Sequence, residues 1–266
     1  MRFAISNGMK IGFFDSGLGG LTILKAVAKE LPDYDYIYYG DTANLPYGDK
    51  SEEKIFALTK AGVAFLFEQD CALVIIACNT ASSETLRKLQ DDFLPASYPD
   101  RRILGVIIPT IEEMINTKAK RALLLATRRT VESGKYPMEL QKHNAKKLTL
   151  YSLPMPGLVP QIESGKSDEA TKEAIKAIDD EERRVGKVDT VVLGCTHYTK
   201  LKDGLRRNYG NRIRFISQDE LIPKKLADYL KKHTEIESKL TRGGTRVIKL
   251  TAEREDYDQI AAELLT

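Results

Sequence analysis

The sequence predicts an α/β protein of two similar lobes, each a mostly parallel sheet flanked by helices, with an active site in the cleft between them. Two apolar runs, residues 72–77 and 190–194, lead to this prediction. Both lack alternation, which is typical of strands buried on both faces of a parallel sheet. Each run ends at a small residue that is followed by a cysteine, Cys78 or Cys195, and two hydrogen-bonding residues. Two such units in 266 residues suit two domains of ordinary size.

The composition excludes several classes of protein. A hydrophobic content of 42% with 30% charged residues is typical of a globular chain. No apolar run reaches the roughly 18 residues that span a membrane, so no membrane partner is expected. The net charge of +3 is small, and the basic clusters at 118–121 and 181–184 alternate with acids. This pattern favours solvated helix faces over a nucleic-acid site.

The cysteines and the start of the chain indicate a cytoplasmic protein. Three cysteines without metal-ligand spacing predict a reducing compartment and no metal site. Cys71 opens the strand that ends at Cys78, and we interpret it as a core residue. Residues 1–8 lack the apolar core of a secretory signal, and we interpret them as an extension.

The predicted elements follow one another as strands and helices of two lobes. We expect the first lobe to comprise residues 1–108 plus 217–266, and the second to comprise 109–216, with Pro109 as the crossing point. The first contains strands at 10–14, 36–39, 72–77 and 103–107, and helices at 21–30, 52–68, 82–93, 221–232 and 256–265. The second contains strands at 122–126 and 190–194, and helices at 111–117, from about 127, and at 168–184.

Two loops stand out as candidate ligand loops. Residues 15–20, Asp-Ser-Gly-Leu-Gly-Gly, follow the first strand, and glycines there permit a tight turn and a close approach. The loop is no dinucleotide fingerprint, because Thr22 stands where a third glycine is needed, and a phosphate-loop lysine is missing. Asp15 is then either a charged group at the sheet edge or a cap of the next helix. The polar loop 40–48 is too long for a simple turn, although a plain surface loop stays possible.

Two opposed thiols suit one kind of reaction. A thiol with an ordinary pKa near 8.5 becomes a thiolate at little cost, especially at a helix N-terminus. Thiols on opposite sides of a Cα–H bond can remove a proton from one face and return one to the other. Asn79, Thr80 and Thr196 are placed to stabilise the carbanion, and Asp15 and His197 to position protons. The alternative is that each cysteine is only a small core residue.

Several motifs along the chain carry a family resemblance. They cover residues 11–265 and comprise 15–20, 40–43, 46–48, 78–81, 127 with 130–131, 159–160 with Glu163, and 193–198. With these motifs the chain resembles the glutamate racemases, the cofactor-independent members of the aspartate/glutamate racemase family. The resemblance implies interconversion of L-glutamate and D-glutamate without a cofactor, for peptidoglycan synthesis. A homodimer is the expected assembly.

The resemblance also implies roles for individual residues. Cys78 would attack D-glutamate with help from Asp15, and Cys195 would attack L-glutamate with help from His197 and Glu163. The histidine after Thr196 favours glutamate over aspartate. The residues that would hold the ligand are Asp15, Ser16, Pro46, Tyr47, Gly48, Asn79, Thr80, Thr127, Thr130 and Thr196.

The chain departs from the family pattern at four places. Thr199-Lys200 replaces a usual Pro-Leu, Thr110 replaces a smaller residue, Met155 stands where cysteine is common, and 215–219 lacks an Asp-Ser pair. These changes concern lobe packing, activators and oligomer geometry. Other function classes stay open: a regulatory or binding protein on a racemase scaffold, a one-thiol lyase or hydrolase, and a racemase of aspartate.

Two geometric expectations complete the prediction. Near-attack contacts on both sides of one carbon place the sulfurs about 7 Å apart, too far for a disulfide. The side-chain carboxylate should be bound by amides and hydroxyls of residues 46–48 and 127–130. Arg128 and Arg129 are expected to face solvent.

Overall fold

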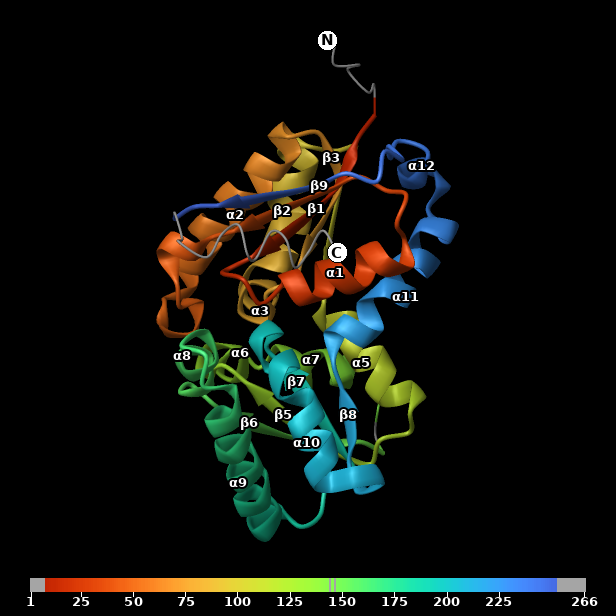
Figure 1. The fold of residues 1–266 in the computed structure, drawn as a ribbon. Coiled ribbons are helices and arrows are strands. Elements are labelled where there is room, and N and C mark those ends of the chain that lie inside the picture. The colour runs from red at the N-terminus through yellow and green to blue at the C-terminus, as the bar shows by residue number, and fades with distance from the viewer. Residues whose placement is uncertain (1–7, 144, 146, 253–266) are drawn as a thin grey trace.

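The computed structural model describes residues 8–143, 145 and 147–252 and contains two parallel sheets flanked by helices. The first sheet has the order β4-β3-β1-β2-β9, and the second has the order β6-β5-β7-β8. Every strand pair in both sheets is parallel. Figure 1 shows the two sheets one above the other, each with helices on its faces. The predicted fold class is confirmed.

The first sheet carries the N-terminal part of the chain and its last strand. Its strands are β1 (Lys10–Asp15), β2 (Tyr36–Gly40), β3 (Cys71–Ile76), β4 (Arg102–Gly105) and β9 (Arg246–Leu250). Its helices are α1 (Leu21–Glu30), α2 (Glu52–Glu68), α3 (Asn79–Lys88), α4 (Leu94–Ser97), α11 (Gln218–Lys232) and α12 (Thr234–Glu237).

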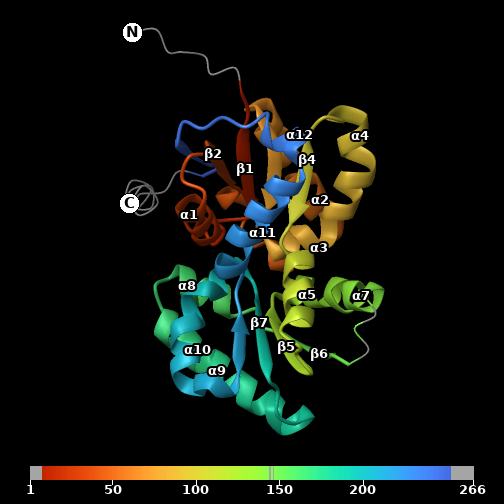
Figure 2. The ribbon, with the colours of Figure 1, turned by 90° about the vertical axis from the view of Figure 1, so that its right-hand side faces the viewer.

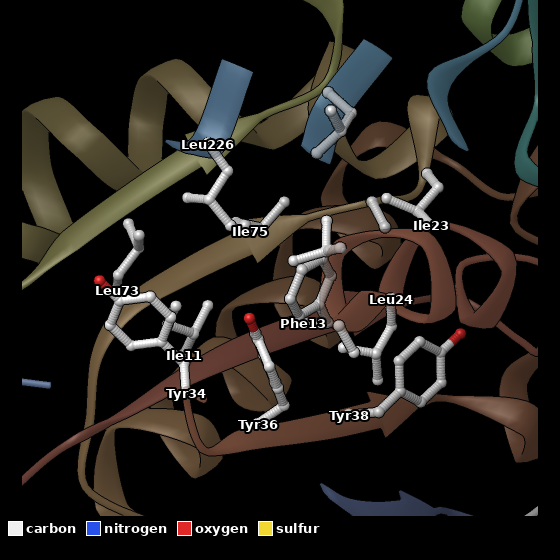
Figure 3. Packing of buried hydrophobic residues seen from close by; sticks show 14 of the residues in the cluster. Ile11, Phe13, Ile23, Leu24, Tyr34, Tyr36, Tyr38, Leu73, Ile75 and Leu226 are labelled. Atoms are coloured by element: carbon white, nitrogen blue, oxygen red, sulfur yellow. The ribbon is translucent and has the colours of Figure 1, made fainter. Parts of the chain in front are cut away.

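Each face of this sheet buries its own apolar core. On one face Phe13 and Ile75 pack with Ile23 of α1 and Leu226 of α11, as Figure 3 shows. On the other face Phe14 and its neighbours pack against α2 and α3. Burial on both faces explains why these strands are apolar throughout. Cys71 lies in the second of these cores, as expected, and burial raises the pKa of its thiol to about 12.

The second sheet is built from the middle of the chain. Its strands are β5 (Arg121–Ala126), β6 (Thr149–Pro154), β7 (Thr190–Gly194) and β8 (Arg214–Ile216). Its helices are α5 (Ile107–Asn116), α6 (Arg128–Glu132), α7 (Lys135–Lys142), α8 (Leu158–Glu163), α9 (Ser167–Val185) and α10 (Lys202–Tyr209). It also buries apolar side chains on both faces, with α8 and α9 on one face and α5 and α7 on the other.

The chain passes between the two sheets twice. It leaves the first sheet after β4 and continues through α5, and it returns from β8 into α11 (Figure 2). The prediction of a strand to residue 107 is wrong in detail, because β4 ends at Gly105 and α5 begins at Ile107 and contains Pro109. A proline is tolerated there since the first helical turn lacks acceptors for its N–H groups. The division at 108/109 and 216/217 stays a prediction.

Several elements differ from their predicted bounds. Strands β6, β8 and β9 and helices α4, α7, α8, α10 and α12 were not predicted, and α3 begins at Asn79, three residues earlier than expected. The three missed strands lie at sheet edges. Most residues of β6 and β9 are only partly buried and β8 has three residues, so the apolar signal is weak. The predicted helix at 256–265 lies outside the described residues. Within the described residues, no helix is long and apolar enough to cross a membrane.

Candidate active site

A narrow cavity of about 50 Å³ lies between the two sheets, at the carboxyl ends of their central strands. It is lined by residues from both: Ser16, Leu45, Pro46, Tyr47, Gly48, Asp49, Cys78, Asn79, Thr80, Thr127, Arg128, Pro156, Val159, Pro160, Cys195, Thr196 and His197. The cysteines thus share one cavity, as the sequence predicts. Both are free thiols and neither forms a disulfide.

Three of the predicted site residues do not line the cavity but contact residues that do. Asp15 accepts a hydrogen bond from Thr196 Oγ1 at 3.3 Å, and Glu163 lies 3.0 Å from His197 Nε2. The hydroxyl of Thr130 lies 3.2 Å from that of Thr80. The sequence did not single out Leu45, Asp49 or Pro156 as site residues, although they also line the wall.

Cys78 begins helix α3 directly after β3. Its sulfur accepts a hydrogen bond from the backbone N–H of Ala81 at 3.4 Å and lies 3.3 Å from the hydroxyl of Ser16. Burial, followed by the negative field of Asp15, raises the pKa of Cys78 to about 12, although both hydrogen bonds act against the shift. Cys78 is therefore a thiol at neutral pH and can donate a proton.

Cys195 follows β7 and faces a different environment. Its sulfur lies 3.8 Å from Nδ1 of His197, whose Nε2 contacts Oε1 of Glu163 at 3.0 Å. Burial by itself lowers the pKa of His197, but its bonds to Cys195 and Glu163 outweigh this effect and raise it to about 10. The imidazole is then cationic at neutral pH and lies beside the sulfur of Cys195.

Asp15 ends strand β1 and has no exposed surface. One carboxylate oxygen accepts the N–H of Gly17 at 2.9 Å, and the other accepts the hydroxyl of Thr196. Burial raises the pKa of Asp15, while the positive charge of His197 is the largest of the opposing effects. The carboxyl is not an N-cap of α1, since Gly20 holds that position without a side-chain bond. The capping alternative for Asp15 is therefore wrong.

The glycine loop 15–20 serves close packing between the two halves of the molecule. A Cβ added to Gly19 would lie 2.4 Å from Thr196 Oγ1 and 2.8 Å from His197 Nδ1. Any side chain there would push the two halves of the site apart. This contact accounts for a glycine at position 19.

Hydroxyl groups and a tyrosine complete the opposite end of the cavity. The hydroxyls of Thr80 and Thr127 lie 2.9 Å apart, and Thr127 also caps α6 through the N–H of Thr130. Tyr47 is buried, and its hydroxyl donates to Asp41 at 2.6 Å. Asp41 also accepts from Thr251, just after β9, so the end of the first sheet holds the loop in place.

The two arginines beside this end differ from each other. Arg128 is exposed, as predicted, and also lines the cavity. The expectation that Arg129 faces solvent is wrong. Its guanidinium forms an ion pair with Glu84 at 2.8 Å and keeps only 26% of its side chain exposed. Glu84 lies on α3, and its buried carboxylate attracts the guanidinium of Arg129, which the sequence had predicted to be exposed to solvent.

The chain is similar to known proteins over most of its length. The model of the family described as Asp/Glu/Hydantoin racemase matches residues 21–217. The glutamate racemase of Jannaschia sp. is 39% identical over 239 residues, which are 86% of this chain and 87% of that protein. The crystal structure of a glutamate racemase from Francisella tularensis in complex with D-glutamate has a TM-score of 0.82 at 27% identity, and covers 97% of this chain and 94% of that one. A glutamate racemase isoform from Bacillus anthracis has a TM-score of 0.84 at 26% identity, with 97% and 94% covered.

Proposed function

Because this chain belongs to the Asp/Glu/hydantoin racemase family, we propose that it interconverts L-glutamate and D-glutamate with two thiols and no cofactor. The observation that carries this proposal is the placement of Cys78 and Cys195 on opposite lobes around one cavity. Each thiol has its own helper groups, Asp15 with Ser16 on one side and His197 with Glu163 on the other.

Burial keeps Cys78 protonated, and the cationic imidazole of His197 lies 3.8 Å from the sulfur of Cys195. We therefore assign Cys195 as the base for L-glutamate and Cys78 as the proton donor. With L-glutamate, Cys195 removes the Cα proton and Cys78 delivers a proton to the opposite face, which gives D-glutamate. Cys195 is then the thiol and Cys78 the thiolate, the arrangement from which D-glutamate reacts in the reverse direction. Asp15 and His197 return the protons between turnovers.

The polar groups of the cavity account for substrate binding. The carbanion formed at Cα is stabilised when donors hold the adjacent carboxylate, and Asn79, Thr80 and Thr196 supply such donors. The side-chain carboxylate is bound at the other end, by the hydroxyl of Thr127 and the backbone near Tyr47 and Gly48. Thr130 supports Thr80 and Thr127 through its hydroxyl.

We further propose the cellular setting that this reaction implies. D-glutamate is supplied for peptidoglycan synthesis by a cytoplasmic homodimer of two-lobed subunits, with lobes 1–108 plus 217–266 and 109–216. The substrate is a small molecule, and the reaction requires no nucleic acid.

The test is circular dichroism of an L-glutamate solution, and separately a D-glutamate solution, with purified protein and no added cofactor. The expected result is decay of the signal to zero from both sides. L-aspartate in a parallel cell distinguishes the aspartate racemase alternative. The proposal would be overturned if the signals of L-glutamate and D-glutamate stayed unchanged over time. Activity only after addition of pyridoxal phosphate would also overturn it.

A further inference from the structure

Asn79 lies next to Cys78 in the cavity wall, and its carboxamide is bound by groups behind the wall. Its Oδ1 accepts hydrogen bonds from the hydroxyl of Tyr136 and from Nε2 of Gln218, both at 2.8 Å. Its Nδ2 donates to Oε1 of Gln218 at 2.8 Å. Asn79 and Gln218 therefore form a reciprocal amide pair between the start of α3 and the start of α11.

A reciprocal amide pair does not by itself fix its own direction. If both carboxamides rotated by half a turn, each would still donate one bond and accept one bond. The direction matters at the cavity, because one arrangement offers an N–H group to a ligand and the other offers an oxygen. A third group must decide between the two arrangements.

Thr110 on α5 supplies that group. Its hydroxyl donates to the backbone oxygen of Val106 at 2.7 Å, and a hydroxyl has only one hydrogen. Towards Gln218 the oxygen of Thr110 can therefore only accept, and the atom 3.4 Å away is Nε2. In the rotated arrangement Oε1 would stand there instead, and two acceptors would face each other.

Burial makes the rotated arrangement costly. Asn79, Thr110, Tyr136 and Gln218 are each at most 2% exposed, so water does not compete for their bonds. The bonds also use both acceptor positions of Asn79 Oδ1 but only one of the two Nδ2 hydrogens. The second hydrogen belongs to a side chain that lines the cavity beside Cys78.

We propose that Thr110 and Gln218 are positioning residues that fix the direction of the Asn79 carboxamide, so that it presents an N–H donor to a carboxylate of the substrate. The inference rests on the proposed function, which places an amino acid carboxylate in this cavity. In the rotated arrangement the oxygen of Asn79 would face that carboxylate and repel it. Thr110 acts on the substrate only through Gln218 and Asn79.

The experiment compares two threonines that differ in one contact. Thr85 is buried in α3 and donates to the backbone oxygen of Ala81 at 2.8 Å, just as Thr110 donates to that of Val106. Within the described residues, however, Thr85 has no hydrogen bond to Gln218. Thr110→Val should raise KM for both enantiomers of glutamate by about 3- to 10-fold, with a smaller change in kcat. Thr85→Val should leave KM and kcat within about twofold of the wild type. Thr110→Ser, which keeps the hydroxyl, should have the KM of the wild type. Gln218→Met, which removes both amide bonds, should raise KM by about 10-fold or more.

The outcomes separate this inference from the proposed function. If the wild-type protein does not racemise glutamate, the proposed function fails before any variant is compared. If it does, an unchanged KM in Thr110→Val overturns the inference, as does an equal rise in Thr85→Val. A lower melting temperature in Thr110→Val with an unchanged KM would also overturn it, because the contact would then be structural only. Should Gln218→Met fail to fold, the two threonine variants still decide.

Discussion

The hydroxyl of Thr196 donates a hydrogen bond to Oδ2 of Asp15 across the boundary between the two sheets, at 3.3 Å. Thr196 follows Cys195 in the chain, and Asp15 raises the pKa of Cys78 through its charge. One buried carboxyl group is therefore linked to both thiols. Burial raises the pKa of Asp15 itself, so this carboxylate is a stronger base than an exposed one and is suited to exchange a proton with Cys78.

Asp15→Asn should still accept from the N–H of Gly17 and should donate its Nδ2 to the hydroxyl of Thr196, but it loses the titrating group. We expect kcat/KM to fall by about 10²- to 10⁴-fold, the usual contribution of a positioned acid or base. The loss must be equal from L- and D-glutamate, because enantiomers have the same free energy and the equilibrium constant is one. Circular dichroism from both sides measures it. A variant within threefold of the wild type would show that Asp15 only joins the two lobes.

The sequence predicts the central strands of this fold better than its edges. The runs ending at Cys78 and Cys195 are buried on both faces, so their composition alone indicates a parallel sheet. Strand β6 is half-buried along its length and β9 alternates, because each has a neighbour on one side only. Neither carries enough apolar signal to be distinguished from a loop.

The residues of the candidate site are likewise predictable only in part. Residues that follow a central strand, such as Asp15 and Cys78, are predictable because parallel strands end at one edge of the sheet. Gln218 and Tyr136 were missed, although Gln218 lies within residues 215–219, the segment that lacks the Asp-Ser pair of the family pattern. Their contact with Asn79 depends on how two distant helices meet, and no local pattern in the sequence records that distance.

A second prediction concerns alkaline pH. The raised pKa of His197, about 10, means that the cation is present below that value and lost above it. Racemisation that starts at Cys195 should therefore decline as the pH rises through about 10, and His197→Asn should lose activity and this limb of the profile together. Kinetics of L-glutamate between neutral pH and pH 10.5 would check it. If His197→Asn still showed the decline in activity near pH 10, that decline would have to come from the titration of another group.

The same shift has a consequence for stability. A histidine whose pKa is raised by folding stabilises the protein fully below its unfolded value of 6.5, and this contribution is lost as the pH rises towards 10. Between pH 6.5 and pH 10, the melting temperature of the wild type should thus fall more than that of His197→Asn. Parallel pH profiles of the two proteins would contradict a buried, protonated His197.

A third prediction concerns the loop that carries Tyr47. Tyr47→Phe removes the donor to Asp41 and leaves a buried carboxylate oxygen with one bond fewer. We expect KM for glutamate to rise by about 3- to 10-fold with little change in kcat, because the proposed function gives this loop a role in substrate binding and none in proton transfer. Tyr36→Phe is the matched control, since Tyr36 belongs to the core of the first sheet and its hydroxyl donates to the backbone oxygen of Leu31. An equal KM effect in both variants would mean that the loss is one of general stability.

The last prediction tests the paired thiols themselves. Cys78→Ala and Cys195→Ala should each reduce racemisation by about 10²- to 10⁴-fold, since inversion needs a base on one face and an acid on the other. A glutamate analogue with a leaving group at Cβ needs only proton removal, so one thiol is enough for elimination. Cys195→Ala should still eliminate from the D-isomer, where Cys78 is the base, and Cys78→Ala from the L-isomer. Cys71→Ala, in the core of the first lobe, is the control for loss of a buried thiol. If either active-site variant racemised glutamate near the wild-type rate, or if both eliminated from the same enantiomer, the assignment of one thiol to each face would be wrong.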